Sequence, residues 1–351
     1  MQKGQHILAE IRNQPQAWAE TIRIVEAAAG PLRDLLAGVD EVIFTGCGSA
    51  LNASHAMAPT FQHFTGTRAR AVPAAEIDFF PETVFAGEGR YLVVAISRSG
   101  STSETVLACD RALNRGMKTL AITCRAESPL ARKANQALVL APANEVSVTT
   151  TQSLSSMILA GQVLSAIAAQ NSDYLAQLRS LPECGRRILA ASHDLGRTIA
   201  ENESINKFAF VGCGALLGLA REAQLKVKEM VLVPSDAYPL LDYRHGPKSN
   251  VDEHMLVTVL MTDRTREVEI EFLQEMKGLG GKLFALCERA DEEVRKYADY
   301  LAEIKSGLPD FARDILYLPA IQFLACYKSL SRGLDPENPV NLTYWVETAH
   351  L

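Results

Sequence analysis

Residues 91–105 read YLVVAISRSGSTSET, an apolar run that ends in a loop of small hydroxyl side chains around Gly100. The run YLVVAIS (91–97) has the length and continuous apolar character of a strand buried on both faces. A helix is predicted from about Ser103 to Arg115. The segment therefore predicts a strand, a hydroxyl-rich loop and a helix in succession.

The same alternation occurs on both sides of this segment. We predict strands at EVIFTG (41–46), KTLAITC (118–124) and QALVLAP (136–142), and a helix near Ser49–Phe64. Short apolar strands that alternate with helices indicate a parallel sheet covered by helices on both faces. Before the first strand, the spacing of apolar residues predicts a leading helix from about Pro15 to Leu36.

The second half of the chain repeats this pattern. VIFTGCG, LVVAIS and TLAITC recur in order as FAFVGCG, LVTVLM and KLFALC. Corresponding residues lie 166, 164 and 163 positions apart: Gly48 and Gly214, Leu92 and Leu256, Thr119 and Lys282. We therefore predict a duplicated α/β fold with two tandem domains, each a parallel sheet flanked by helices in a flavodoxin-like three-layer sandwich. Two unrelated α/β domains are the alternative.

A length of 351 residues also favours two domains. The expected boundaries are an N-terminal helical segment (1–38), a first domain (39–170), a helical connection (171–202), a second domain (203–334) and a C-terminal tail (335–351). The first domain carries the hydroxyl-rich loop.

Composition excludes several classes of function. A formal net charge of −6 argues against non-specific binding of nucleic acid. The seven cysteines are an odd number without a CxxC pair, which favours reduced thiols and a cytoplasmic location. The N-terminus lacks the apolar core of a signal peptide, and no apolar stretch approaches the roughly 18 residues that span a membrane.

Cofactor and metal motifs are also missing. The dinucleotide fingerprint G-x-G-x-x-G has Leu51 at its third glycine in GCGSALN, and Leu217 at that position in the second copy. No GK[ST] follows the glycines, so a nucleotide-binding P-loop is not expected. The histidines form no cluster with metal-ligand spacing, although His55 and His63 share one predicted helix. We therefore expect neither a cofactor nor a metal.

The hydroxyl-rich loop itself predicts an anion site. At the carboxyl edge of an open parallel sheet, free N–H groups of the next helix point outward and favour a negative charge. Glycines such as Gly48 and Gly100 let the backbone approach a ligand closely. The alternative is that these hydroxyls only cap the helix, but one side chain is enough for a cap. Phosphate binding is the better explanation of so many hydroxyls.

On these features the chain resembles the two-domain sugar isomerase (SIS) family. It is similar to the isomerase half of glutamine–fructose-6-phosphate aminotransferases, and to free-standing amino-sugar-phosphate deaminases and fructosamine-phosphate deglycases. The resemblance covers nearly the whole chain after the leading helix. Its most specific segments are SRSGSTSET, REAQLKVKE (221–229), YPLLDYRHGP (238–247) and DPENPVNL (335–342).

The resemblance implies where a sugar 6-phosphate binds. The loop 97–102 would hold the phosphate, the loop 46–50 would lie over the sugar, and EVSVTTTQS (145–153) would be a strand that lines it. Relatives often have glutamine at the position of Arg98, and the hydroxyl side chain that they usually have at the position of Ala50 is absent here. The implied substrate-binding residues are Ser49, Ser97, Arg98, Ser99, Thr102, Val148 and Thr150.

The resemblance also implies the catalytic pair. Glu229 matches the glutamate that moves a proton between C1 and C2 of the sugar, and His245, 16 residues later, matches the histidine that opens the ring. Taken alone, KVKE is typical of a solvated helix face, and Lys226 and Lys228 either offset substrate charge or are solvated. In the family the histidine enters a neighbouring subunit's site, which implies a homodimer with shared active sites.

The C-terminal tail departs from the family. Tyr344 stands where the synthases have a lysine that forms a Schiff base, and a phenol cannot form an imine with a keto sugar. The tail is expected to lie over the active site, with Tyr344 near the substrate. No glutaminase region precedes the isomerase region, so glutamine-dependent synthesis is not expected.

The reaction that remains is the reverse one. Proton transfer from C2 to C1 of an amino-sugar 6-phosphate of the glucosamine type gives a ketimine, which water hydrolyses without an enzyme lysine. We therefore expect a sugar-phosphate isomerase/deaminase. The alternatives are a fructosamine-6-phosphate deglycase, a plain aldose–ketose isomerase of phosphosugars, and a sugar-phosphate sensor without catalysis.

Overall fold

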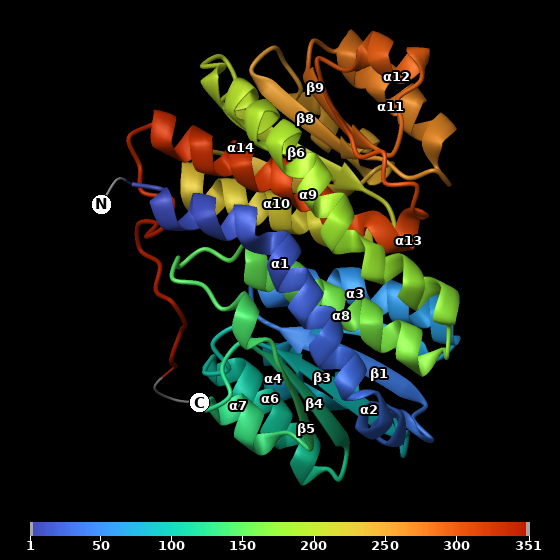
Figure 1. Cartoon of the computed structure of the whole chain (residues 1–351). Coiled ribbons are helices and arrows are strands. Elements are labelled where there is room, and N and C mark those ends of the chain that lie inside the picture. The colour runs from blue at the N-terminus through green and yellow to red at the C-terminus, as the bar shows by residue number, and fades with distance from the viewer. Residues whose placement is uncertain (1–2, 349–351) are drawn as a thin grey trace. The chain divides into compact units, whose positions relative to one another are not determined.

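A computed structural model describes residues 3–348, and these form two compact units (Figure 1). One unit consists of residues 13–146, 150–182 and 343–348, and the other of residues 3–12, 147–149 and 183–342. Each contains one five-stranded sheet.

The sheet of the first unit is parallel throughout, in the order β2-β1-β3-β4-β5. Its strands are β1 (Glu41–Gly46), β2 (Arg68–Pro73), β3 (Tyr91–Ile96), β4 (Lys118–Thr123) and β5 (Gln136–Val139). The order reverses between β1 and β3, so their carboxyl ends flank the crevice where ligands of such sheets bind. The predicted strands are confirmed at four of these places, and β2 was not predicted.

Helices cover both faces of this sheet. They are α2 (Ala29–Leu36), α3 (Ser49–Thr65), α4 (Ala74–Phe79), α5 (Pro81–Val84), α6 (Ser103–Asn114), α7 (Pro129–Lys133) and α8 (Gln152–Ala168), with a 3-10 turn at Ala141–Ala143. Consecutive residues of β1 show the two faces. The Phe44 ring packs edge-to-face against Phe61 of α3, with ring centroids 5.8 Å apart, whereas Ile43 joins a cluster with Ile77 of α4 and Ala108 of α6. Both residues are fully buried, as the continuous apolar run predicts.

The predicted leading helix is wrong in its bounds. The structure has α1 (Gln5–Ala27) followed by α2, and Pro15 lies inside α1 instead of at its start. A distant contact extends α1 toward the N-terminus, because the carboxylate of Glu337 accepts hydrogen bonds from the backbone N–H groups of His6 and Ile7. A partner about 330 positions away in the chain is not visible in local spacing.

The sheet of the second unit has the order β10-β9-β8-β6-β7, also parallel. Its strands are β6 (Lys207–Gly212), β7 (Ser235–Pro239), β8 (Met255–Leu260), β9 (Lys282–Cys287) and β10 (Tyr300–Glu303). Read from β7, this is the strand order of the first sheet, so β6 corresponds to β1 and β8 to β3. The predicted duplication of an α/β domain is confirmed.

Further helices complete the second unit. They are α9 (Ser172–Glu201, shared with the first unit), α10 (Leu216–Val231), α11 (Arg266–Gly278), α12 (Glu292–Tyr297), α13 (Asp310–Arg313) and α14 (Leu318–Ser331), with 3-10 turns at Asp242–Arg244, Pro247–Asn250 and Asp314–Tyr317. One face of the sheet packs a cluster around Phe272 and Met276 of α11. On the other face, α10 packs against β6, β7 and α14.

The segment 145–153, expected to be a strand, is not one. After β5 and the turn Ala141–Ala143, the chain has no strand before α8 begins at Gln152. The buried Glu145 side chain explains the irregular course, since its carboxylate accepts hydrogen bonds from the backbone N–H groups of Thr151 and Gln152. Those bonds fold the segment back on itself.

Candidate active site

The hydroxyl side chains of the loop 97–102 form a compact cluster at the carboxyl end of β3. Ser97 Oγ lies 3.1 Å from Thr102 Oγ1 and 3.4 Å from Ser99 Oγ. The backbone N–H of Gly100 donates to Ser97 Oγ, and that of Ser101 to Ser99 Oγ. The loop therefore curls around three hydroxyl groups, each of which is able to donate to an anion.

Gly100 makes this curl possible. Its φ is +63°, and a Cβ atom built there would lie 2.1 Å from Ser128 Oγ and 2.8 Å from Thr123 Oγ1. The first value is far inside van der Waals contact, and the conformation itself is unfavourable for other residues. The glycine is required both by its conformation and by its surroundings.

The alternative of a simple helix cap is not supported. Thr102 is the N-cap residue of α6, yet its side chain makes no capping hydrogen bond. The hydroxyls of Ser97, Ser99 and Thr102 face one another instead. The loop thus brings together three of the predicted phosphate-binding residues at the N-terminus of a helix, where the helix dipole favours an anion.

The neighbouring loop after β1 is also shaped by glycines. A Cβ atom at Gly46 would lie 2.7 Å from Ala50 Cβ and 2.8 Å from the carbonyl oxygen of Ile96, so β1, β3 and α3 meet closely here. Gly48 has a φ of +55°. Ser49 is the first residue of α3 and is half-buried.

The side chain of Arg98 contacts Glu145 and the C-terminal tail. Its side chain is 6% exposed and forms an ion pair with Glu145 at 3.4 Å. Its Nη2 donates to the carbonyl oxygen of Tyr344 at 3.1 Å, and its guanidinium stacks on the Tyr344 ring, 3.8 Å from the centroid. The side chain of Arg98 therefore joins the loop to the C-terminal tail.

Tyr344 is held from several sides. Its hydroxyl donates to the carbonyl oxygen of Glu145 at 2.8 Å and lies 3.1 Å from Asn144 Oδ1. Arg125 approaches the same ring at 4.9 Å, and burial raises the pKa of the phenol, against the lowering effect of Arg98. The tail continues to α6, where the N–H of Ser103 donates to the carbonyl of Val346. This tyrosine anchors the tail to the first unit.

The remaining predicted contacts, Val148 and Thr150, fall in different units. The N–H of Val148 donates to the carbonyl oxygen of Glu337 at 2.8 Å, in the unit that contains the second sheet. Thr150 belongs to the first unit and is half-buried. Both side chains leave part of their surface exposed.

Glu229 lies in a row of charged residues on α10. Lys226 Nζ is 2.6 Å from Glu229 Oε2 and 3.3 Å from Glu222 Oε1. Lys226 and Glu222 are each 1% exposed, whereas the Glu229 side chain is 20% exposed. Burial opposes the charge on Lys226, but the two carboxylates outweigh it and raise the lysine pKa.

The structure thus distinguishes Lys226 from Lys228, for which the sequence alone left the same two roles open. Lys226 is buried in the charged row, and Lys228 is exposed to solvent. The spacing of Glu222, Lys226 and Glu229 places all three on one face of a helix, and this was the sequence signal available for the row. Glu229 is the member that reaches solvent.

His245 lies on an exposed turn after β7. Its N–H donates to the carbonyl oxygen of Asp242 at 3.0 Å, and Gly246, with a φ of +124°, follows it. Among the described residues, no hydrogen bond or ion pair joins His245 to Glu229. His245 is exposed to solvent.

Other features of the described residues limit the chemistry. Residues 3–348 hold no group of three or more His, Cys, Asp or Glu side chains arranged to bind a metal ion. All seven cysteines are free thiols. Within this part of the chain, no helix has the length and apolarity needed to cross a membrane.

Two parallel sheets of one strand order, each with a glycine-rich loop after its first strand, define a duplicated α/β domain. A model of the SIS domain family matches residues 35–167 and 203–312, which contain the two sheets. The chain therefore belongs to the SIS domain family, as its resemblance to that family predicted.

Relatives with assigned names fall into three groups. The chain is 27% identical over 338 residues to the glutamine–fructose-6-phosphate aminotransferase (isomerizing) of Methanothermobacter thermautotrophicus, covering 96% of this chain and 56% of that protein. It resembles the tagatose-6-phosphate ketose/aldose isomerase of Escherichia coli (TM-score 0.86, 25% identity, 94% of this chain and 93% of that one). It also resembles the glucosamine-6-phosphate deaminase of Thermotoga maritima (TM-score 0.71, 29% identity, 93% and 99%).

The chain spans about half the length of the curated aminotransferases that it matches. The named relatives are enzymes of phosphosugar conversion, and they differ in substrate and in reaction. Family membership therefore defines the class of chemistry but not the sugar.

Proposed function

We propose that this protein is a sugar-phosphate isomerase/deaminase that acts on an amino-sugar 6-phosphate of the glucosamine type. The observation that carries the proposal is the cluster of Ser97, Ser99 and Thr102 hydroxyls, which are not used for capping and lie at a helix N-terminus. Such a cluster suits a phosphate dianion. The similarity to a glucosamine-6-phosphate deaminase over most of both chains supports the choice of sugar.

The proposed reaction needs one proton shuttle. After ring opening by His245, the carboxylate of Glu229 removes the proton from C2 and returns it to C1. Loss of the C2 proton, with uptake of a proton by the aldehyde oxygen, gives an enolamine with a C1=C2 double bond. When C1 takes up the proton, the nitrogen lone pair forms the C2=N bond and one N–H proton is released, which gives a ketimine at C2. Water adds to this carbon and ammonia leaves, which yields the ketose phosphate. The ion pair with Lys226 fixes the position of the Glu229 carboxylate during this transfer.

Tyr344 is compatible with this route. Its ring lies against Arg98, and its hydroxyl is bonded to the Glu145 carbonyl, so it acts as an anchor. Hydrolysis of a ketimine uses water as the nucleophile and requires no amine from the protein. Loss of the family lysine therefore leaves this reaction intact, whereas synthesis through a Schiff base is not proposed.

A panel of substrates tests the proposal. The purified protein is incubated with glucosamine 6-phosphate, N-acetylglucosamine 6-phosphate, galactosamine 6-phosphate and fructoselysine 6-phosphate. Ammonia, lysine and ketose phosphate are then measured. Ammonia with ketose phosphate from a hexosamine supports the deaminase. Lysine release would identify a deglycase, and tight binding without turnover of any compound would identify a sensor.

A second candidate, the plain aldose–ketose isomerase, is favoured by the similarity to a tagatose-6-phosphate isomerase, with a TM-score of 0.86. Tagatose 6-phosphate and fructose 6-phosphate are therefore added to the panel. Glu229→Gln should abolish turnover in either case and leave phosphate-dependent binding unchanged. Lys228→Gln, an exposed neighbour, is the matched control and should be fully active.

We also propose a cytoplasmic homodimer with shared active sites. The exposed position of His245 on a turn, without a partner side chain among the described residues, supports its entry into a neighbouring subunit's site. Mixing inactive Glu229→Gln and His245→Ala proteins and letting them re-associate should restore part of the activity. No recovery in a mixed oligomer would rule out sharing.

A further inference from the structure

The second sheet has its own counterpart of the hydroxyl-rich loop. Because both sheets have one strand order, the loop after β8 (Met261–Thr265) corresponds to the loop after β3 (Ser97–Thr102). It also precedes a helix, α11, and it contains Thr262 and Thr265. By topology alone it is a second candidate for an anion site.

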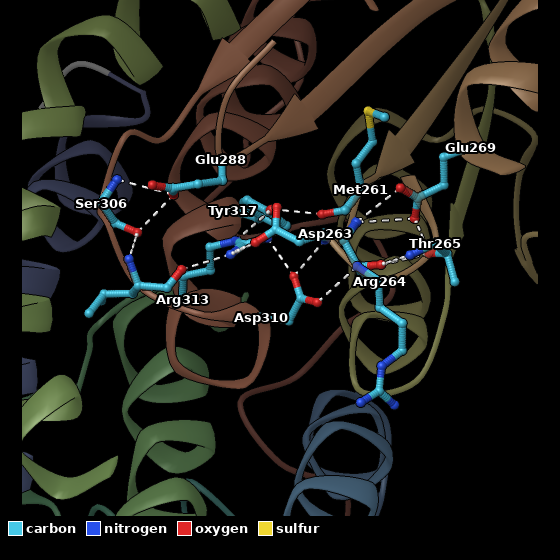
Figure 2. A network of polar contacts seen from close by, with 12 residues as sticks. Met261, Asp263, Arg264, Thr265, Glu269, Glu288, Ser306, Asp310, Arg313 and Tyr317 are labelled. Carbon is cyan, nitrogen blue, oxygen red and sulfur yellow. Dashed lines mark hydrogen bonds and ion pairs between the residues drawn. The ribbon is translucent and has the colours of Figure 1, made fainter. Parts of the chain in front are cut away.

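The donors of this loop are already bound to carboxylates of the chain. The N–H groups of Asp263 and Arg264 donate to the two oxygens of Asp310, at 2.8 and 3.3 Å. The N–H of Thr262 donates to both oxygens of Glu269, and Thr265 Oγ1 donates to Glu269 Oε1 at 2.8 Å. Figure 2 shows these contacts on the two carboxylates. In the first domain, the corresponding loop hydroxyls contact one another instead.

Arg313 fixes Asp310 in this position. Its side chain is 1% exposed and pairs with both Asp310 and Asp263. It also donates to the carbonyl oxygen of Leu308 at 2.7 Å, and Tyr317 links it to the carbonyl of Met261. The Asp310 carboxylate thus has two backbone N–H donors and a guanidinium, which is the set of donors expected around a bound oxyanion.

Little room remains beside this carboxylate. A cavity of about 90 Å³ adjoins the loop, lined in part by Cys213, Thr262, Asp310 and Asp314. Pockets for small organic ligands measure about 300–1,000 Å³. Burial, with the nearby Asp310 charge adding to it, raises the pKa of Asp314 to about 8, although Arg313 opposes the rise. The backbone N–H groups of Thr262, Asp263 and Arg264, which would otherwise be donors for a phosphate, are thus already bonded to carboxylates of the chain.

We propose that the Asp310 carboxylate occupies the anion site of the loop 261–265, which corresponds to the phosphate site proposed at the loop 97–102. Asp310 would thereby prevent the second domain from binding sugar phosphates. The chain would then bind substrate phosphate in the first domain alone. The assignment of a phosphate site to the loop 97–102 rests on the proposed function. The role of Asp310 does not, because it follows from contacts within the second domain.

Chemical rescue tests Asp310 directly. Asp310→Ala leaves two N–H donors and Arg313 around an empty space of carboxylate size. We expect its Tm to fall by about 5 °C in chloride. Acetate or formate at equal ionic strength should restore at least half of the loss, relative to wild type in the same salts. Asp263→Ala is the matched control, since it removes the other carboxylate of Arg313 but accepts no backbone bond of the loop. Equal Tm values of Asp310→Ala in chloride and in acetate would overturn the proposal.

Phosphate stoichiometry gives a second test on proteins that keep Asp310. Calorimetric titration of the wild-type chain with inorganic phosphate should show no more than one site per chain, absent in Ser99→Ala/Thr102→Ala. A site that survives in this variant and disappears on Arg313→Gln would place phosphate in the second domain. This result would refute the proposal that Asp310 occupies the anion site there. Absence of any phosphate site would count against the proposed function, while rescue of Asp310→Ala by acetate or formate would still support the proposed role of the Asp310 carboxylate.

Discussion

Lys226 Nζ and Glu229 Oε2 lie 2.6 Å apart on one face of α10, and Glu222 holds the lysine from the other side at 3.3 Å. The lysine and Glu222 are buried, and Glu229 alone of the three extends toward solvent. This arrangement gives a flexible glutamate a fixed position. A proton shuttle between adjacent carbons depends on such a fixed position.

The first prediction concerns this ion pair. Lys226→Met should lower kcat by about 100-fold, because Glu229 loses the partner that positions it. It should also lower the free energy of unfolding by about 3 kcal/mol, since Glu222 is left buried without its cation. Steady-state kinetics with the active sugar phosphate and urea denaturation measure the two effects. Lys228→Met, two residues further along the helix, should change neither.

The second prediction concerns the conformation of the hydroxyl-rich loop. Gly100→Ala should lower the free energy of unfolding by about 3 kcal/mol, because the new methyl group meets Ser128 and the positive φ is unfavourable. Ser128 cannot move aside freely, since its Oγ caps α7 and donates to the Arg125 carbonyl. Gly116→Ala is the control for φ alone: its φ is +70° and nothing lies within 4 Å. The free energy of unfolding of this control variant should fall by only about 1 kcal/mol. Equal losses in the two variants would contradict the close contact.

The third prediction concerns the anchor of the tail. Tyr344→Leu removes the stacking with Arg98 and Arg125 and the hydrogen bonds of the phenol. The amide of Thr348, which donates to Ser103 Oγ, should then exchange with solvent at least about tenfold faster. Hydrogen exchange read by mass spectrometry measures this. Thr343→Ala, whose hydroxyl bonds only within the tail, should leave the rate unchanged.

The central strands of both sheets were predictable because each is apolar on both faces, as in YLVVAI of β3. The strands missed were β2, β7 and β10, which lie at sheet edges and are only partly buried. Their side chains face solvent often enough to break the apolar run, so RARAVP has no strand signal of the buried type. An edge position is not decisive by itself, because β5 is also an edge strand and its apolar run QALV was predicted.

The candidate site was predictable where its residues are contiguous. Ser97, Ser99 and Thr102 form one loop, and the sequence places them together without any knowledge of the fold. The direction of Arg98 was not predictable, because it depends on Glu145 and on Tyr344, 246 positions away. Contacts over such separations are set by packing. The loop motif therefore predicts an anion site but not the distant contacts that its side chains make.

The last prediction concerns Asp78, on α4 beside the loop after β1. Its side chain is 5% exposed, and neither carboxyl oxygen has a hydrogen-bond partner. Burial raises its pKa to about 7; Arg111 opposes the rise, and Glu104 adds to it. A carboxyl group whose pKa is higher in the folded than in the unfolded protein favours the folded state when it is protonated. Its contribution to stability is therefore complete below pH of about 4 and is lost as the pH rises through about 7.

Asp78→Asn removes this loss, because the amide stays neutral at every pH. At pH 8 the variant should exceed wild type in free energy of unfolding by about 1–2 kcal/mol, and at pH 4 the two should be nearly equal. Urea denaturation from pH 4 to 8 gives the profile. Asp40→Asn should behave in the opposite sense, because hydrogen bonds from Arg90 lower the pKa of Asp40 to about 2 and the ionised form is the one that stabilises. If Asp78→Asn has the same profile as wild type, Asp78 is ionised in the folded protein and the raised pKa is wrong. The Cys47 thiol, whose pKa burial raises to about 11, stays neutral across this range and does not contribute to the difference.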